Sequence, residues 1–309
     1  MYYDIIIVGA GPAGLAASLY ARRSGKTVLL LEKESFGGQM ALAPLIENYP
    51  GFNKISGEAL AGSMVDQVMA MGVEFELEKV INITKDETSK VKNFTIQTDY
   101  NTYQAGAVIW AAGAFHKMIN VEKEKDLIGN GVSYCAVCDG AFYKGEEVAV
   151  IGDGNTALQY ALELSENSPK VYICIMFDEF MGDAVLREKV RNNPKIEIVP
   201  NVLLQAFLGS EKLEGLVFEN QKTKAKITIN VKGVFIAIGQ IPQNDAIKNL
   251  AQLDKDGYAI ASEDLITKTE GLFVAGDCRT KKVRQVATAI NDGAIAALEA
   301  CNYLNNHED

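Results

Sequence analysis

The chain has 309 residues, which is enough for two compact domains, and its formal net charge is −10. That charge argues against general binding to nucleic acid or to an anionic membrane, because both would repel the protein at long range. Hydrophobic residues at 48% and charged residues at 23% are ordinary for a soluble α/β protein and exclude a disordered or fibrous chain.

The first residues carry Asp4 and no basic residue before an apolar run, unlike the start of a signal peptide. The glycines that follow, together with Pro12, interrupt any membrane-spanning helix. Five cysteines do not fit the dense, even pairing of a secreted disulfide framework. We therefore expect a cytoplasmic protein in a reducing compartment.

Two segments repeat one order of predicted elements. Residues 4–32 and 147–175 each predict a strand, a glycine turn, a helix and a second strand. The spacing from the third position of the turn motif to the end of the second strand also agrees, at eighteen residues for both Gly14 to Glu32 and Ala157 to Ile175. The predicted fold class is therefore α/β, with two Rossmann-like nucleotide-binding domains of the three-layer ββα type.

Each repeat is followed by alternating polar and apolar residues, at 73–112 and 196–239, which predict a small antiparallel meander running into an apolar strand. The last segment, 271–304, predicts a buried strand, a loop and a long amphipathic helix. It has no third glycine motif. We therefore expect it to complete the first domain, with the second domain inserted.

The first glycine turn, GAGPAG, has the context of a dinucleotide site. Gly9 permits a tight turn, Gly11 lets a pyrophosphate approach the backbone, and Gly14 lets helix and strand pack closely. The helix N-terminus favours an anion. Glu32, at the end of the next strand, can accept hydrogen bonds from the adenosine ribose. A glycine turn without a ligand is the alternative.

A cysteine pair follows in the stretch YCAVCDG. The spacing of Cys135 and Cys138 lets the two sulfurs meet across one helical turn or form a disulfide, and such pairs can exchange two electrons. Structural zinc is the main rival. It needs four ligands, usually with a second close pair, yet Cys174, Cys278 and Cys301 are scattered through the sequence.

Several stretches together resemble the low-molecular-weight thioredoxin reductase family over essentially the whole chain. They are GAGPAG, Glu32, GGQM, ENYPG, AAGA, YCAVCDG and VAGDCRTKKVRQVATAINDGAIAA. The resemblance implies an FAD-binding domain at 1–115 and 244–309, and a central domain at 116–243 that carries the redox-active pair. It also implies a homodimer that reduces thioredoxin or a similar dithiol protein. The net charge leads us to expect no nucleic-acid or membrane partner, and the scattered cysteines lead us to expect no metal.

The same resemblance implies particular site residues. Cys138 would face the flavin, Cys135 would exchange with the substrate disulfide, and Asp139 would act as general acid and base. Asp277 would lie near the ribityl chain, and Val286 replaces the family's alanine near the isoalloxazine. The implied cofactor-binding residues are Gly9, Gly11, Pro12, Ala13, Gly14, Glu32, Lys33, Gly38, Gln39, Asn48, Ala112, Gly276, Asp277, Arg284, Gln285 and Val286.

The second glycine turn, GDGNTA, lacks the charges that follow it in the family. The NADPH-specific segment, His-Arg-Arg and a later Arg, is replaced by apolar residues, which are Ile175, Met176, Phe177 and Met181. Charge-assisted hydrogen bonds are worth ~1.5 to 3 kcal/mol each, so losing two or three costs about two to five powers of ten in affinity. NADH is no easy substitute, because Ile175 cannot bond a ribose hydroxyl and Asp153 adds a negative charge beside the turn.

We therefore expect reduced ferredoxin as the electron donor, as in the ferredoxin-dependent flavin thioredoxin reductases that this sequence is most similar to. Basic residues at 22–26 and 279–284 would offset the overall negative charge where such an acidic carrier docks. Three alternatives stay open: a conventional NADPH-dependent thioredoxin reductase, a dithiol oxidase that discharges electrons to oxygen, and a flavin-binding redox sensor.

Overall fold

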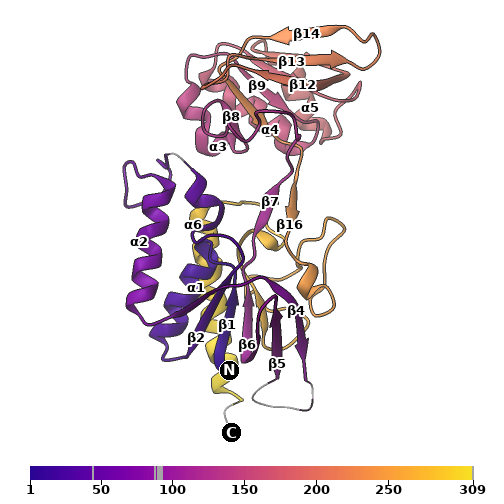
Figure 1. The fold of residues 1–309 in the computed structure, drawn as a ribbon. Coiled ribbons are helices and arrows are strands. Elements are labelled where there is room, and N and C mark those ends of the chain that lie inside the picture. The colour runs from indigo at the N-terminus through magenta and orange to yellow at the C-terminus, as the bar shows by residue number, and fades with distance from the viewer. Residues whose placement is uncertain (44, 87, 89–92, 308–309) are drawn as a thin grey trace. The chain divides into compact units, whose positions relative to one another are not determined.

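The computed structural model describes residues 1–43, 45–86, 88 and 93–307 (Figure 1). The chain divides into two compact units, Met1–Phe115 with Ile241–Asp309 as unit 1 and His116–Gln240 as unit 2. It passes between the units in β7 (Ala114–His116) and β16 (Gln240–Pro242), which pair as a two-stranded sheet. Unit 2 is therefore an insertion within unit 1.

Within the described residues, the strands of unit 1 form a seven-stranded sheet in the order β3-β2-β1-β6-β5-β4, with β17 pairing β6. The strands are β1 (Tyr2–Val8), β2 (Val28–Glu32), β3 (Glu74–Leu77), β4 (Val80–Lys85), β5 (Phe94–Thr98), β6 (Thr102–Trp110) and β17 (Leu272–Val274). The apolar run of β1 is buried on both faces, with Ile5, Ile6 and Ile7 fully buried. This is typical of a parallel strand covered on both sides.

Three helices of unit 1 lie together on one face of the sheet (Figure 1). They are α1 (Pro12–Arg23), α2 (Gly57–Ala70) and α6 (Val286–Asn305). The 3-10 turns are η1 (Gly38–Leu42), η3 (Asp245–Ile247) and η4 (Gly276–Cys278). Gly293 of α6 packs so closely on α1 that an added Cβ would lie 2.0 Å from the carbonyl oxygen of Ala13. The predicted C-terminal helix therefore does complete the N-terminal unit.

Unit 2 repeats this design with a parallel sheet in the order β11-β10-β9-β15-β8 and an antiparallel sheet in the order β12-β13-β14. The parallel strands are β8 (Val132–Ser133), β9 (Val148–Ile151), β10 (Val171–Cys174), β11 (Ile196–Val199) and β15 (Gly233–Ile236). The antiparallel strands are β12 (Val202–Leu208), β13 (Gly215–Asn220) and β14 (Lys226–Ile229). The helical elements are α3 (Ala136–Asp139), η2 (Gly140–Tyr143), α4 (Asn155–Asn167) and α5 (Ala184–Arg191).

The α/β class with parallel sheets is as predicted, but the first strand of each predicted meander was assigned the wrong partner. β3 pairs in parallel with β2, and β11 pairs in parallel with β10. Part of the first meander, residues 87 and 89–92, lies outside the described residues. Alternation predicts a strand with one covered face, and it does not say which neighbour the strand joins.

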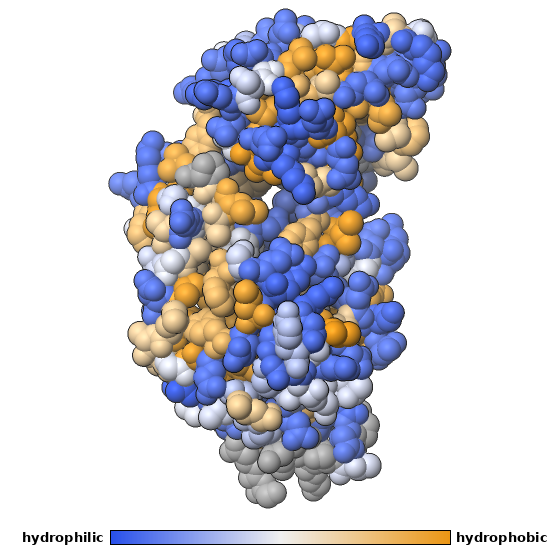
Figure 2. All heavy atoms as spheres, viewed as in Figure 1, coloured by the Kyte–Doolittle hydropathy of each residue, from blue (hydrophilic) through white to orange (hydrophobic). Residues whose placement is uncertain are grey.

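Hydrophilic side chains are spread over both units on the face drawn in Figure 2, with hydrophobic ones scattered among them. Among the residues that the structure describes, no helix combines the length and the apolar character needed to cross a bilayer.

Candidate functional site

The first glycine turn combines two tightly packed glycines with one that faces open space. An added Cβ would lie 2.4 Å from the carbonyl oxygen of Ala111 at Gly9 and 1.8 Å from that of Gly9 at Gly14. At Gly11 it would meet no described atom within 4 Å. Gly11 is also the N-cap of α1, and no described side chain caps that helix end. The free N–H groups of α1 therefore border a space that suits a phosphate.

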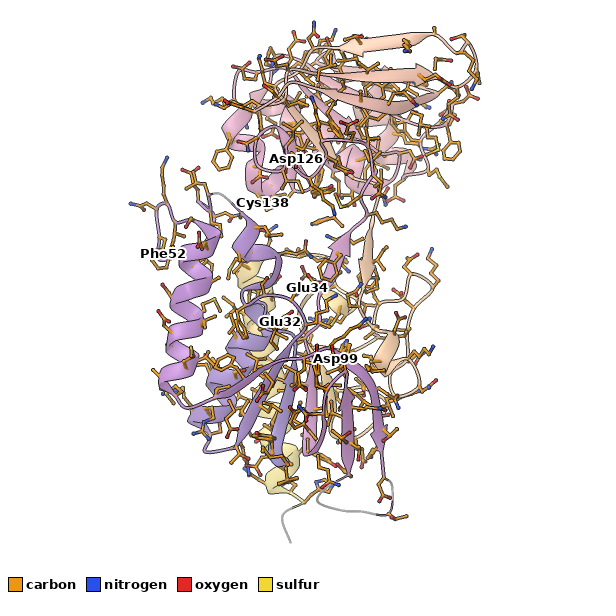
Figure 3. The ribbon with its side chains drawn as sticks, viewed as in Figure 1. Glu32, Glu34, Phe52, Asp99, Asp126 and Cys138 are labelled. Carbon is orange, nitrogen blue, oxygen red and sulfur yellow. A yellow bond between two sulfur atoms is a disulfide. The ribbon has the colours of Figure 1, made fainter. Side chains whose placement is uncertain are left out.

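Glu32 lies at the carboxyl end of β2, beside the first glycine turn (Figure 3). Its carboxylate accepts the backbone N–H groups of Ala10 at 2.8 Å, Lys33 at 2.8 Å and Glu34 at 2.9 Å. The ammonium group of Lys33 lies 4.5 Å from the centre of the Phe115 ring. The backbone thus fixes a carboxylate where a ribose hydroxyl could donate to it.

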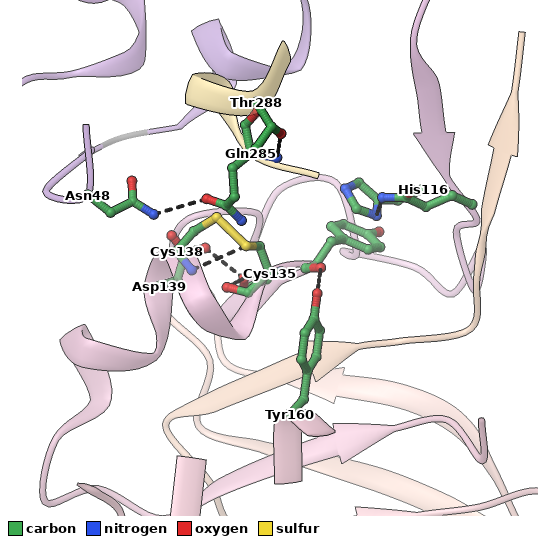
Figure 4. Close-up of a disulfide and its surroundings, with 11 residues drawn as sticks. Asn48, His116, Cys135, Cys138, Asp139, Tyr160, Gln285 and Thr288 are labelled. Carbon is green, nitrogen blue, oxygen red and sulfur yellow. Dashed lines mark hydrogen bonds between the residues drawn. A yellow bond between two sulfur atoms is a disulfide. The ribbon is translucent and has the colours of Figure 1, made fainter. Parts of the chain in front are cut away.

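Two predicted cofactor-binding residues, Gln39 and Asn48, form hydrogen bonds with residues distant in the sequence. The side-chain amide of Gln39 donates to the carbonyl oxygen of Ala114. Asn48 Nδ2 donates to Gln285 Oε1 at 3.1 Å, and the backbone N–H of Gln285 donates to Thr288 Oγ1 at 3.2 Å in the capping box of α6 (Figure 4).

Two further predicted cofactor-binding residues, Gly38 and Val286, pack against other parts of unit 1. Gly38 adopts φ +56°, and an added Cβ there would lie 3.1 Å from Cα of Gly11. Val286 begins α6 and packs against the small core that includes Met40. Ala112, at the end of the β6 segment, packs half-buried against a core that includes Trp110.

Asp277 has a buried carboxylate oxygen, Oδ1, without a hydrogen-bond partner in the described part of the chain. Burial raises the pKa of this carboxyl, while Lys281 and Arg284 oppose the shift. The guanidinium carbon of Arg284 lies 4.4 Å from the centre of the Tyr258 ring. Lys281 Nζ lies 4.0 Å from the same oxygen, which is an ion-pair distance and too long for a hydrogen bond. A buried acceptor without a hydrogen bond suits a donor such as a ribityl hydroxyl.

These observations fit FAD. The open face of Gly11 at a helix N-terminus suits the pyrophosphate, Glu32 suits the adenosine ribose, and the Asp277 oxygen that lacks a hydrogen bond suits a polyol chain. Gly276, with φ +77°, packs against α1, where an added Cβ would lie 2.9 Å from Cβ of Ala13.

Cys135 and Cys138 form a disulfide at the start of α3, with their Cα atoms 5.3 Å apart (Figure 4). The backbone N–H of Cys138 donates to Cys135 Sγ at 3.2 Å. The pairing that the spacing allows is therefore the one observed. The other cysteines, Cys174, Cys278 and Cys301, are buried.

Asp139 ends α3, and burial raises the pKa of its carboxyl. Ser133 opposes that shift, because its hydroxyl donates to Asp139 Oδ2 at 2.6 Å. A carboxyl with a raised pKa close to a redox-active disulfide suits proton transfer to and from a thiolate.

The segment 134–140, which carries the cysteine pair and is called the redox loop here, has partners that the sequence did not predict. The Tyr134 hydroxyl donates to Glu124 Oε1 at 2.7 Å. The backbone carbonyl oxygen of Tyr134 accepts a hydrogen bond from the Tyr160 hydroxyl at 3.1 Å (Figure 4). The His116 ring stacks on Tyr134 with centroids 5.0 Å apart. Position next to Cys135 was the only signal for Tyr134, and nothing in the sequence pointed to the others.

The second glycine turn keeps the geometry of the first. Gly152 adopts φ +143°, and an added Cβ would lie 2.4 Å from the carbonyl oxygen of Ala237. At Gly154, the N-cap of α4, an added Cβ would meet no described atom within 4 Å, and no described side chain caps the helix. This turn therefore also suits a phosphate.

The strand end beside that turn carries apolar side chains. Ile175 is only 1% exposed and lies in the core of unit 2. Met176, Phe177 and Met181 are 48%, 49% and 75% exposed. Met176 and Phe177 help to line a surface pocket of about 480 Å³.

Two cations do approach this strand end, from positions that sequence reasoning missed. Lys222 forms an ion pair with Asp178, and Arg191 forms one with Glu179. The bond from Lys222 lowers the pKa of the Asp178 carboxyl. Each cation is thus already matched by a carboxylate, which a phosphate would have to displace.

The basic clusters expected to dock an acidic carrier are only partly available, which corrects that expectation. Arg279 and Lys281 turn inward to the buried Asp292, at 2.8 and 3.0 Å. Arg22 donates to the carbonyl oxygens of Met71 and Lys26. Basic residues that are adjacent in the sequence can thus form ion pairs inside the folded protein instead of a charged surface.

Known proteins resemble this chain along nearly its whole length. A family model described as pyridine nucleotide-disulphide oxidoreductase matches residues 3–293. Thioredoxin reductase from Bacillus subtilis is 36% identical over 308 residues, which cover 99% of this chain and 96% of that protein. A 34.2 kDa protein in the rubredoxin operon of Clostridium pasteurianum is 36% identical, with 97% of each chain covered. The crystal structure of thioredoxin reductase from Streptococcus pyogenes has a TM-score of 0.94 at 34% identity, with 99% of each chain covered.

The fold, the FAD cofactor and the enzyme class expected from the sequence are thereby confirmed. The chain belongs to the pyridine nucleotide-disulphide oxidoreductases and, among them, to the low-molecular-weight thioredoxin reductase family, whose members are FAD-dependent disulfide reductases.

Proposed function

We propose that this protein reduces the disulfide of thioredoxin, or of a similar dithiol protein, through Cys135 and Cys138, with electrons from reduced ferredoxin. The observation that carries the reductase is the Cys135–Cys138 disulfide beside Asp139, whose carboxyl has a raised pKa. Relatives named thioredoxin reductase support the choice of substrate.

The two units divide the work in this proposal. Unit 1 is the FAD-binding domain, and unit 2 is the domain that carries the redox-active pair. The second boundary between them lies after residue 240, three residues before the expected one. The homodimer and the cytoplasmic location expected from the resemblance are part of the same proposal. Bound FAD would supply a two-electron store for the protein dithiol. Gly11, Glu32 and Asp277 are the residues that we assign to its pyrophosphate, ribose and ribityl groups.

The cysteine pair acts by thiol–disulfide exchange. In the reduced enzyme the Cys135 thiolate attacks one sulfur of the substrate disulfide, which breaks and releases the first substrate thiolate. The Cys138 thiolate then attacks Cys135 Sγ, re-forms the enzyme disulfide and releases the second. Two protons are needed to make both substrate products thiols, and Asp139 exchanges protons with the sulfurs at this site. Two electrons from the donor restore the dithiol.

The residues that follow β10 favour ferredoxin over NADPH as the electron donor. A 2′-phosphate placed there would meet exposed Met176 and Phe177, and the nearby cations Lys222 and Arg191 are paired with carboxylates. An iron–sulfur carrier has no such requirement, because it needs only access to an edge of the cofactor. The relative from Clostridium pasteurianum is named for its place in a rubredoxin operon, which gives this class of donor modest support.

A pyridine-nucleotide donor is the second candidate, and one observation favours it. The turn at Gly152 and Gly154 keeps its shape, and the N-terminus of α4 is open to a pyrophosphate. A nucleotide held through that contact alone would bind without the 2′-phosphate contributing to its affinity. On this alternative NADH and NADPH should serve about equally.

Turnover with cysteine variants tests the reductase. The FAD-loaded protein is mixed anaerobically with oxidised thioredoxin and chemically reduced ferredoxin, and free thiols on thioredoxin are counted. We expect Cys135→Ser and Cys138→Ser each to lower turnover at least a thousandfold while FAD stays bound, since exchange requires both sulfurs. Cys174→Ser, a change at a buried cysteine outside the pair, is the control that keeps turnover. Undiminished turnover in Cys135→Ser would reject the proposal.

A further inference from the structure

Ser133 places its hydroxyl between the two ends of the redox loop. It ends β8, where it is paired with Phe235 of β15, and it is 4% exposed. Its oxygen accepts the backbone N–H of Cys135 at 3.0 Å and its proton is directed to Asp139 Oδ2 at 2.6 Å. One side chain at the end of the edge strand β8 thus joins the first cysteine to the acid.

We propose that Ser133 is a positioning residue for Asp139, which it holds against the redox loop and stabilises when the carboxyl is ionised. This inference rests on the proposed role of Asp139 as the proton donor and acceptor of the disulfide.

The geometry gives the Ser133 hydroxyl a partner in either protonation state of Asp139. A second acceptor, the carbonyl oxygen of Cys135, lies 3.4 Å from Oγ. When Asp139 is ionised, the short bond to its carboxylate is preferred because it is charge-assisted. When Asp139 is protonated, its own O–H can donate to Oγ, whose second lone pair is available, and the serine proton can turn to Cys135.

The proton step then balances. Two electrons enter the disulfide, the S–S bond breaks and two thiolates form. Protonated Asp139 passes its proton to one of them, which leaves a thiol and a carboxylate. The Ser133 hydroxyl turns back to that carboxylate and stabilises it. The steps run in reverse when the thiol gives up its proton for attack on the substrate disulfide.

Within the described part of the chain, two other titratable side chains interact with Asp139. Tyr143 of η2 and Tyr160 of α4 interact with it electrostatically, and burial raises the pKa of both phenols, that of Tyr160 to about 12. Both therefore stay neutral at working pH. Among the described residues, Ser133 donates the side-chain hydrogen bond that stabilises the charged carboxyl relative to the neutral one.

The test is a titration of Asp139 itself, by carbon-13 NMR of protein labelled at the aspartate side-chain carboxyl carbons. The Asp139 signal is assigned by its absence in Asp139→Asn. A hydrogen bond to a charged group has the strength that corresponds to about one to two pH units. We therefore expect Ser133→Ala to raise the pKa of Asp139 by about that amount, and the Asp139-dependent limb of the pH–turnover profile to move to higher pH equally.

A matched pair separates the hydroxyl from the space it fills. Threonine and valine have nearly the same shape and both suit a strand. Ser133→Thr should keep the wild-type pKa of Asp139, and Ser133→Val should raise it as Ser133→Ala does. If the alanine variant fails to fold, the threonine and valine variants still give the comparison. Ser165→Ala, on α4, removes another buried hydroxyl and should leave Asp139 unchanged.

An Asp139 titration that is the same in Ser133→Val, Ser133→Thr and wild type would overturn the proposal. The NMR titration needs no substrate or electron donor. If the protein reduces no disulfide with any donor, the proposed function fails while the titration still decides whether Ser133 stabilises the ionised carboxyl.

Discussion

At the scale of single residues, Gly11 and Gly14 lie in one turn and do different things. Gly14 is required by the fold, because an added Cβ would overlap the carbonyl oxygen of Gly9 at 1.8 Å. Gly11 adopts φ −76°, which any residue tolerates, and its Cα faces open space. No described atom therefore requires glycine at position 11, whereas a pyrophosphate approaching the backbone would.

The matched substitutions Gly11→Ala and Gly14→Ala test this division. Gly14→Ala should destabilise the apoprotein by about 1 to 3 kcal/mol, because a tightly packed site is overfilled. Gly11→Ala should leave apoprotein stability within about 1 kcal/mol and weaken FAD binding at least tenfold. Thermal unfolding of the apoproteins and fluorescence titration with FAD measure the two effects. Unchanged FAD affinity in Gly11→Ala would remove the pyrophosphate from this turn.

Residues also show where the sequence was sufficient. The tight packing at Gly9 and Gly14, the place of Glu32 at a strand end and the disulfide of the cysteine pair were predictable, because a local pattern defines each. The ion pairs of Lys222 with Asp178 and Arg191 with Glu179 were not, since they join positions 44 and 12 residues apart through folding of the chain. The hydrogen bond from Ser133 to Asp139 depends on where β8 ends relative to α3, and no motif encodes that.

At the scale of elements, the strand that enters unit 2, β7, contacts the redox loop through a pair of stacked rings. His116 ends β7 and stacks on Tyr134, and its Nδ1 lies 3.3 Å from the Nε2 of Gln240 in β16. Burial lowers the pKa of His116 to about 4. The neutral ring is therefore part of the packing that supports the loop before Cys135.

This buried histidine predicts a pH dependence of stability. The unfolded chain binds a proton on His116 near pH 6.5, and the folded chain does so only near pH 4. Between these values the unfolded state binds more protons, so the free energy of unfolding falls as the pH falls. From pH 6.5 to 5 the loss is at most about 2 kcal/mol. Denaturant unfolding should show it in wild type and lose it in His116→Phe, which keeps an aromatic ring.

The chain's other histidine provides the control for that experiment. Because the pH dependence is assigned to His116, it should persist in His307→Phe, a change at an exposed residue just after α6. If His116→Phe and wild type lose the same free energy of unfolding between pH 6.5 and 5, the ring is not held neutral by burial.

At the scale of the whole molecule, the two units share a turn and differ at the strand end beside it. Unit 1 places Glu32 at the end of β2, fixed by three backbone N–H groups. Unit 2 places Ile175 at the matching position and buries it. The repeat was predictable from spacing. The fate of Ile175 was not, because apolar residues at a strand end can face either the core or the surface.

The electron donor is decided most directly by anaerobic titration of the FAD-loaded, oxidised protein, followed at the flavin absorption band. Reduced ferredoxin, NADPH and NADH are added in parallel at equal electron equivalents. The double variant Met176→Arg with Phe177→Arg is the matched control, because both side chains are about half exposed and accept charge without disturbing the core. We predict rapid bleaching of wild type by ferredoxin, little by NADPH, and a response to NADPH in the arginine variant. Rapid bleaching of wild type by micromolar NADPH, with ferredoxin inert, would contradict this account.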